Sequence, residues 1–390
     1  MYITELNLVR NTLNVNVLNY DLNQEEYEYA FYLYRNNKRV EIKWYEKNSQ
    51  HSFYLDNNTG VYFVKAFLRK SKNSDLIIFD SEELVYKGSS YNIKNWDYEL
   101  NRIGQNYFAN LENLTLKDGL YQLECEYESI DFLFEGMSKI KKENGILVCL
   151  SGAVGDRENK QAPFFSGLNI AKTLNMPIIS IADPSLNISN DISLGWYAGN
   201  ENLKNLPQII ANTLDSISKK LNTKMIFFGG SGGGFASLSI INHMEEKAYG
   251  LVWNPQTSIS KYYKSHVINY IEKSFHKEII NSNLYSSLDK IGIVHDVTKL
   301  YAKTLKKEAC ILYLQNSDDT FHVENHLYPI MNAVKAKKDN DHIYSSSAGI
   351  LFWVKCWGKG HTSPNSSMIL EILRRIINDD DINSIALSLE

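Results

Sequence analysis

The chain has 390 residues, of which 44% are hydrophobic and 22% are charged, and this balance is typical of globular rather than disordered proteins. Its 41 basic and 45 acidic residues leave a formal net charge of −4, which gives no support to nucleic-acid binding. No stretch has the pattern of a signal peptide or the length of a membrane span, so we expect a cytoplasmic protein without a membrane span. The four cysteines lie far apart and predict neither a disulfide framework nor a zinc knuckle.

The first 90 residues alternate apolar and polar side chains with a period of two. Leu13, Val15 and Val17 alternate with asparagines, a pattern that indicates half-buried antiparallel strands. The turn Asn36-Asn37-Lys38 separates two further alternating runs and predicts a hairpin. We therefore predict a small antiparallel β-sandwich at residues 1–90 as an accessory domain, with structural support as its main role and glycan or partner binding as the alternative.

From about residue 118 onward, apolar runs of strand length alternate with segments of helix length. This alternation predicts an α/β fold with a mostly parallel, eight-stranded sheet and flanking helices over residues 118–390. Residues 91–117 are aromatic and polar, and we interpret them as a connector. The eight strands are predicted at residues 120–127, 130–135, 146–150, 178–181, 225–229, 250–253, 310–315 and 350–354.

The motif G-x-S-x-G stands at Gly229, Ser231 and Gly233, directly after a predicted strand and before a segment that favours a helix. A serine on such a sharp turn projects its hydroxyl above the sheet, and bulky neighbours would close the turn. We therefore predict that Ser231 is a nucleophile. The N–H of Gly232, at the helix start, would donate to an oxyanion, and one such donor contributes a rate factor of roughly a hundredfold to a thousandfold.

A phosphate-binding loop is the alternative interpretation of these glycines. A Walker loop requires Lys and then Ser or Thr after its last glycine, but Gly234 is followed by Phe235 and Ala236. The dinucleotide-binding fingerprint also fails, because its third glycine is replaced by Phe235 or Ser237. The serine nucleophile is therefore the preferred interpretation.

A serine nucleophile needs a base and an acid, which follow it in the order Asp or Glu and then His. His361 lies after the last predicted strand, behind two glycines that allow a close approach, and we predict that it is the base rather than a surface loop residue. Asp318 and Asp319 both follow the strand at 310–315. One of them is expected to accept a hydrogen bond from Nδ1 of His361, and the other to cap the next helix.

His322 and His326 are spaced to share one face of a helix, which raises the question of a metal site. The intervening Val323, Glu324 and Asn325 do not follow the zincin order, in which Glu comes directly after the first histidine, and no third ligand is evident. We therefore predict no metal and assign these two histidines a substrate-binding or structural role.

The elbow at residues 229–233, the aspartate loop at 316–323 and the turn at 358–361 together resemble the α/β-hydrolase superfamily over roughly residues 118–390. More narrowly, the run from Gln315 through His322 to His326, with the amino-terminal patterns at residues 31–34 and 60–62, resembles bacterial capsule and surface-glycan O-acetyltransferases and accessory-secretion acetyltransferases. The superfamily also contains esterases, lipases, peptidases and thioesterases, so fold alone does not select the reaction.

The resemblance implies further site features. The acid in such enzymes often stands a few residues before a small apolar residue, which selects Asp319 through Val323, with Asp318 as second choice. The second oxyanion donor is expected in the loop after the third strand, at the N–H of Ala153, with Gly152 or Val154 as neighbours; an ordinary turn is the alternative. Residues 255–308 are expected to form a cap. Its tyrosines suit a sugar or acyl pocket or plain packing.

The resemblance and the residues together imply ping-pong acyl transfer through Ser231. The main expectation is O-acetylation of a bacterial capsular or surface polysaccharide, with acetyl-coenzyme A as the acyl donor and no permanently bound cofactor. A carboxylesterase or carbohydrate deacetylase is the alternative, because water in place of the sugar hydroxyl gives hydrolysis. A second alternative is an inactive hydrolase-fold protein that binds glycans or serves as a scaffold. The oligomeric state is left open.

Overall fold

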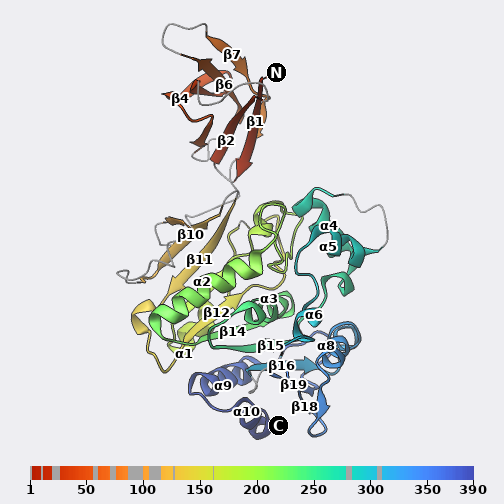
Figure 1. Ribbon diagram of the computed structural model, residues 1–390. Coiled ribbons are helices and arrows are strands. Elements are labelled where there is room, and N and C mark those ends of the chain that lie inside the picture. The colour runs from red at the N-terminus through yellow and green to blue at the C-terminus, as the bar shows by residue number, and fades with distance from the viewer. Residues whose placement is uncertain are drawn as a thin grey trace. The chain divides into compact units, whose positions relative to one another are not determined.

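The computed structural model describes residues 2–9, 12–19, 27–55, 60–70, 76–86, 100–104, 116–125, 128–160, 162–277, 283–304 and 310–390. The chain divides into two compact units, Met1–Asn92 (unit 1) and Ile93–Glu390 (unit 2) (Figure 1). No helix in these described ranges combines the length and the apolar character needed to cross a membrane.

Unit 1 consists of two antiparallel sheets that share one hydrophobic core. The first sheet has the order β1-β2-β5; the second has the order β4-β3-β6-β7, with β8 paired to β6. Inward residues of both sheets, such as Val15 and Phe31, are buried in the same cluster. The strands are β1 (Tyr2–Val9), β2 (Thr12–Asn19), β3 (Glu28–Arg35), β4 (Lys38–Glu46), β5 (Gln50–Tyr54), β6 (Gly60–Arg69), β7 (Ile77–Asp80) and β8 (Leu84–Tyr86).

The predicted hairpin of unit 1 lies between β3 and β4. Asn36 and Asn37 form its turn with φ values of 48° and 63°, as a two-residue turn matched to the strand twist requires. The apolar alternation of β4 does not reach the core, because Val40 and Trp44 are 47% and 64% exposed. The period of two therefore indicates a strand here without showing which face is buried.

Unit 2 is built on one mixed sheet with the order β17-β18-β19-β16-β15-β14-β12-β13-β11-β10-β9. The stretch from β13 to β19 through β12, β14, β15 and β16 is parallel throughout. The strands are β9 (Leu100–Gly104), β10 (Gly119–Glu124), β11 (Ser129–Glu135), β12 (Ile146–Leu150), β13 (Ile178–Ile181), β14 (Met225–Gly230), β15 (Ala248–Trp253), β16 (Ile311–Asn316), β17 (Lys337–Lys338), β18 (Ile343–Ser345) and β19 (Ile350–Lys355).

The α/β class is confirmed, but in the described part of the chain the sheet has eleven strands rather than the eight predicted. Each predicted strand is present within a few residues of its expected bounds, and the last two residues of the strand predicted at 120–127 lie outside the described ranges. The three additional strands are β9, which lies in the segment interpreted as a connector, and the short strands β17 and β18. Runs of two to five residues with few apolar side chains carry too little periodicity to be recognised from sequence.

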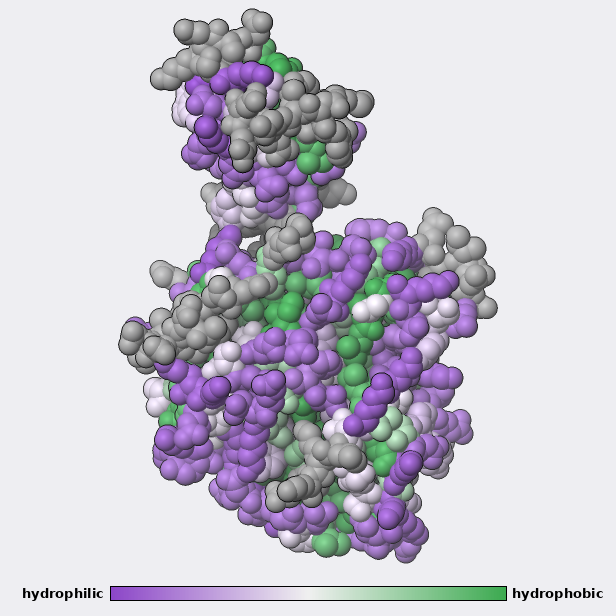
Figure 2. All heavy atoms as spheres, viewed as in Figure 1, coloured by the Kyte–Doolittle hydropathy of each residue, from purple (hydrophilic) through white to green (hydrophobic). Residues whose placement is uncertain are grey.

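Helices cover both faces of the sheet (Figure 1). Consecutive residues of one strand, such as Leu147 and Val148 of β12, point to opposite faces of the sheet and belong to two different hydrophobic clusters. The first cluster includes side chains of helices between residues 206 and 333, and the second those of helices at residues 168–174 and 366–389. The continuous apolar runs of the central strands follow from this arrangement, since a sheet covered on both faces has no polar side. The face of unit 2 seen in Figure 2 is mainly hydrophilic, with hydrophobic residues in narrow strips.

The helices of unit 2 are α1 (Leu168–Leu174), α2 (Leu206–Leu221), α3 (Ser231–His243), α4 (Lys264–Phe275), α5 (Leu284–Ile291), α6 (Val297–Tyr301), α7 (Thr320–His322), α8 (Tyr328–Ala333), α9 (Ser366–Ile377) and α10 (Ile382–Leu389). Short 3₁₀ segments are η4 (Met137–Lys139), η5 (Pro184–Asn187) and η6 (Ile259–Lys261). One π-helical turn, η7 (Val323–Leu327), joins α7 to α8. The parallel strands β12, β14, β15, β16 and β19 all end at the same edge of the sheet, which is where side chains of α/β sites collect.

Candidate active site

Ser231 stands at the junction of β14 and α3, in the left-handed backbone region with a φ of 54°. This conformation is costly for a residue with a side chain and is found mainly at functional turns. The neighbouring glycines are required by space: a Cβ on Gly230 would lie 2.1 Å from Nε1 of Trp253, and one on Gly233 would lie 2.3 Å from the carbonyl oxygen of Leu150. The local geometry is that of a nucleophile elbow.

The two predicted oxyanion donors lie beside this elbow. Gly232 is in the first turn of α3, where backbone N–H groups have no intrahelical acceptor. The loop after β12 packs against the elbow, since a Cβ on Gly152 would lie 3.4 Å from the carbonyl oxygen of Gly230. In this loop the N–H of Val154 donates to Ser193, whereas those of Gly152 and Ala153 have no partner in the described part of the chain. The N–H of Ala153 is thus free to donate to an oxyanion, whereas that of Val154 is already engaged.

His361 lies in the loop between β19 and α9, and this loop is held by two buried asparagines. Nδ2 of Asn316 donates to the carbonyl oxygens of Gly358 and Gly360 at 2.7 and 2.6 Å. Its Oδ1 accepts from the N–H of Trp357, at 2.9 Å. Asn254, at the end of β15, donates to the carbonyl oxygen of Thr362 at 2.9 Å. These bonds anchor the loop on both sides of His361.

The two candidate acids do different things. Oδ2 of Asp319 lies 2.5 Å from Nδ1 of His361, and the Asp319 side chain is only 6% exposed. Oδ2 of Asp318 instead accepts from the N–H of Gly360, at 2.7 Å. Asp319 is also the residue that caps α7, through its bond from the N–H of His322, so the expected division of roles between the two aspartates differs from the observed one. The structure brings Asp319, and not Asp318, to His361.

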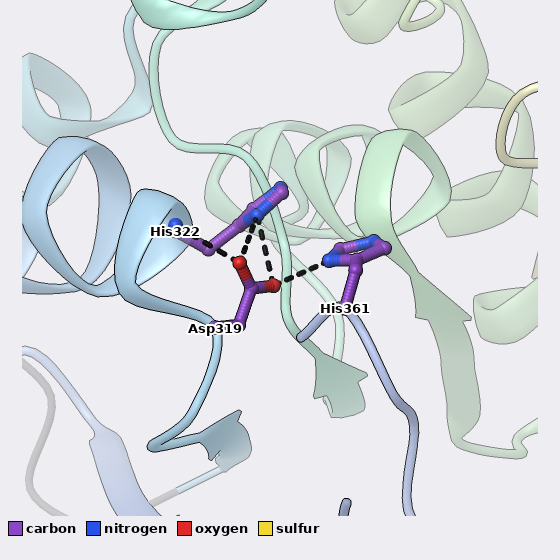
Figure 3. Close-up of side chains that lie close together, drawn as sticks. All are labelled: Asp319, His322 and His361. Carbon is purple, nitrogen blue, oxygen red and sulfur yellow. Dashed lines mark hydrogen bonds and ion pairs between the residues drawn. The ribbon is translucent and has the colours of Figure 1, made fainter. Parts of the chain in front are cut away.

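A second histidine shares the same carboxylate (Figure 3). Nδ1 of His322 lies 3.1 Å from Oδ1 and 2.9 Å from Oδ2 of Asp319, and the rings of His322 and His361 stack with centroids 4.2 Å apart. His322 had been assigned only a substrate-binding or structural role from sequence. Its contact with Asp319 arises because Asp319 is the N-cap of α7 and His322 lies three residues further on, at the end of that helical turn.

Ser231 is bonded to a residue that sequence reasoning did not single out. Nε2 of Gln256 lies 2.7 Å from Oγ of Ser231 and 3.1 Å from Nε2 of His322. Among the described residues no hydrogen bond joins Ser231 directly to His361. Gln256 follows β15, the strand next to that of the nucleophile, and this position at a carboxyl end was the signal available in the sequence.

The electrostatics of the cluster favour one charged histidine at most. Burial first, and then the charge of the neighbouring His361, lower the pKa of His322 to about 4, although the charge of Asp319 and the hydrogen bond to it act in the opposite direction. Burial would raise the pKa of Asp319, but the hydrogen bonds from His361 and His322, together with the electrostatic interaction with His322, outweigh burial and hold that pKa below its usual value. Asp319 is therefore an ionised acceptor and His322 a neutral donor.

His326 lies one π-helical turn beyond His322 and contacts the loop that carries Gln256. Its Nδ1 accepts from the N–H of Thr257 at 3.2 Å, and its carbonyl oxygen accepts from Oγ1 of Thr257. Burial lowers the pKa of His326 to about 3. The wider η7 turn, a feature found often near functional sites, directs both histidines to the segment after β15.

Asp319, His322 and His361 each offer a ligand atom within 4.8 Å of the others, so the cluster has the size of a metal site. Hydrogen bonds account for this geometry, because a carboxylate that accepts from two imidazole N–H groups draws them together. That the site binds no metal ion stays a prediction.

The tyrosines of the predicted cap differ in burial. Tyr270 and Tyr301 are buried and donate to the carbonyl oxygens of Gly199 and Leu238, so they serve packing. Tyr263 is 51% exposed and stacks on Phe321 with ring centroids 4.5 Å apart. Of these three tyrosines, Tyr263 is the one exposed to a ligand, while Tyr262 and Tyr285 of the same segment are half-buried.

No protein-family model matches the chain, and no curated protein has a significantly similar sequence. Similar solved structures include an acetyl xylan esterase from Paenibacillus sp. R4, 15% identical with a TM-score of 0.42, covering 71% of this chain and 92% of that one. Another is acetyl xylan esterase 1 from Thermoanaerobacterium sp. JW/SL YS485, 11% identical with a TM-score of 0.41 and coverages of 64% and 78%. The acylaminoacyl peptidase of Pyrococcus horikoshii is 10% identical with a TM-score of 0.40, covering 96% of this chain and 68% of that one. At these values the similarities show neither the family nor the activity of this chain.

Proposed function

We propose that the chain is a serine-dependent ester hydrolase of the α/β-hydrolase type. Ser231 is the nucleophile, His361 the general base and acid, and Asp319 the carboxylate that orients His361. The N–H groups of Gly232 and Ala153 stabilise the oxyanion. The observation that carries the proposal is the strained backbone of Ser231 at one strand end, combined with the Asp319–His361 bond supplied by two other strand ends of the same sheet edge.

The tautomer of His361 follows from its bond to Asp319. Because Nδ1–H donates to the carboxylate, the lone pair on Nε2 is left to receive the proton of Ser231. Oγ attacks the acyl carbon, the oxyanion collapses, and His361 returns the proton to the departing alcohol. Water then repeats the sequence on the acyl-serine. A direct bond between Ser231 and His361 is expected to form when substrate binds, as in other such sites.

Access of water favours hydrolysis over transfer to another acceptor. The side chain of His361 is 44% exposed, so solvent reaches the base that activates the second nucleophile. O-Acetylation of a capsular or surface polysaccharide with acetyl-coenzyme A as donor, the main expectation from sequence, would use the same acyl-serine with a sugar hydroxyl in place of water. The two reactions differ only in the acceptor and are separated by experiment.

The test compares the wild type with Ser231→Ala. We expect the wild type to react with a fluorophosphonate probe and to cleave p-nitrophenyl acetate, and Ser231→Ala to do neither. Ser237→Ala is the matched control, since Ser237 is a buried serine of the same helix that donates to Gly233. Labelling that persists in Ser231→Ala would exclude this nucleophile.

The acceptor is then identified by mass spectrometry of polysaccharides incubated with the enzyme. Loss of acetyl groups from an acetylated glycan supports the hydrolase. Gain of acetyl groups from acetyl-coenzyme A supports the transferase. Binding of glycan with neither change supports the inactive binding protein.

A further inference from the structure

Gln256 is a fully buried amide whose hydrogen bonds all lie within the candidate site. Its side chain contacts the indole of Trp196, the hydroxyl of Ser231 and the ring of His322. A buried amide of this kind has to be satisfied at both ends, so each of its bonds constrains the others.

The orientation of this amide is determined by Trp196. The indole Nε1 is only ever a donor, and it lies 3.2 Å from one end of the amide, so that end is the oxygen Oε1. The other end is therefore the nitrogen, which carries two protons. One proton points to Oγ of Ser231 and the other to Nε2 of His322.

These two donations determine the role of each acceptor. Oγ of Ser231 accepts from Gln256 and keeps its own proton free to donate to a base. Nε2 of His322 accepts as well, so the proton of that ring is on Nδ1, where it is donated to Asp319. With its lone pair engaged, His322 is unable to take the proton of Ser231, which leaves His361 as the only base on Asp319.

We propose that Gln256 is a further catalytic residue, whose forked amide donates to the nucleophilic oxygen of Ser231 and, through His322 as a positioning residue, directs proton transfer to His361 alone. This proposal rests on the proposed role of Ser231. When the Oγ–H bond breaks, the proton goes to Nε2 of His361 and the electron pair of Oγ forms the bond to the acyl carbon. The hydrogen bond that the Gln256 amide donates to Oγ stabilises the negative charge that grows on this oxygen, and it does so again when Oγ departs in deacylation.

The first arm of the test uses Gln256→Met, which keeps the length of the side chain and removes the donor. We expect kcat for p-nitrophenyl acetate to fall about a hundredfold with KM unchanged, because the lost bond acts on the reacting oxygen. Gln122→Met is the matched control: Gln122, in β10, is also a buried glutamine, and its side chain donates to Asp131 of β11. We expect this control to keep its kcat. An unchanged kcat in a folded Gln256→Met would overturn the proposal.

The second arm needs no turnover. In Gln256→Glu the donor becomes an acceptor of the same shape, so His322 is expected to gain a proton on Nε2. Nuclear magnetic resonance of isotope-labelled histidine, with the signals of His322 assigned through His322→Gln, reports this change. If Gln256 already accepted a proton from Nε2 of His322 in the wild type, the Nε2 signal would stay unchanged in Gln256→Glu, and that result would overturn the proposal even where Gln256→Met does not fold.

The two proposals fail separately. Activity and probe labelling that survive in Ser231→Ala refute the nucleophile, whatever Gln256 does. Full loss of activity in Ser231→Ala, combined with a wild-type kcat in Gln256→Met and an unshifted His322 signal in Gln256→Glu, refutes only the role of Gln256.

Discussion

Nδ1 of His361 lies 2.5 Å from Oδ2 of Asp319, although 42 residues separate them in the chain. β16 and β19 are neighbours in the sheet, and each continues into a loop at the same edge, so the pair follows from strand order. The adjacent Asp318 uses its carboxylate on the backbone of Gly360 instead.

Replacing these two aspartates separates their roles. We expect Asp319→Asn to lower kcat about a thousandfold or more, because an amide at this position no longer selects the productive tautomer of His361. Asp318→Asn keeps an oxygen that accepts from Gly360 and should lose less than about tenfold. Steady-state kinetics with p-nitrophenyl acetate measure both. Equal losses in the two variants would contradict the assignment.

Removal of the Asn316 side chain should loosen the loop that holds His361 in place. Asn316→Ala loses three hydrogen bonds to residues 357–360, and we expect kcat to fall at least about tenfold while the fold persists. Asn200→Ala serves as the control, since Asn200 is a buried asparagine whose Oδ1 accepts from Asn202 and Leu203. It should be destabilised without a loss of kcat. A drop in kcat in both variants would show a general effect of lost stability.

Because the elbow is tightly packed, adding one methyl group at Gly233 should strongly lower the stability of the fold. In Gly233→Ala the new Cβ would lie 2.3 Å from the carbonyl oxygen of Leu150, and we expect a loss of about 3 kcal/mol of unfolding free energy or a failure to fold. Gly155→Ala, where nothing lies within 4 Å of the Cβ, should be nearly neutral. Urea unfolding of the two variants gives the comparison, and a neutral Gly233→Ala would be inconsistent with this elbow.

Acid should destabilise unit 2 through its buried histidines. The pKa values of His322 and His326 are held at about 4 and about 3 in the folded chain, below the 6.5 of a free histidine, so unfolding takes up protons below about pH 6.5. The stability contributed by each neutral histidine is complete above that pH and decreases as the pH falls towards the folded values. Each of the two histidines is expected to lower the free energy of unfolding by about 2 kcal/mol between pH 8 and pH 5.

The measurement is urea unfolding of the wild type and His326→Gln at both pH values. The variant should show a smaller difference between the two conditions, whatever its stability at pH 8. An identical pH dependence in variant and wild type would mean that His326 titrates normally.

Chelation tests the prediction that no metal takes part. Prolonged treatment with EDTA should leave esterase activity unchanged, because Asp319 is engaged by two imidazole N–H groups. Activity that disappears on chelation and returns with a divalent cation would assign the Asp319, His322 and His361 cluster to a metal instead.

Short stretches of sequence were enough to predict the elbow and the central strands. The motif around Ser231 is contiguous and its glycines are explained by space within a few residues, so the elbow was predictable from residues 225–237 alone. The central strands were equally clear, since a sheet covered on both faces produces long apolar runs. The strands β9, β17 and β18, at or next to the two edges of the sheet, were not, because they are short and carry too few apolar residues to show a period.

Only the tertiary structure decided between adjacent or distant alternatives. Asp318 and Asp319 have the same side chain, and the choice between them depends on which one faces His361 across two neighbouring loops. Gln256 and His322 are 66 residues apart and carry no motif that links them. Hydrogen bonds between side chains act over about 3 Å in space regardless of separation along the chain, so a site assembled from several strand ends becomes visible only when the sheet is formed.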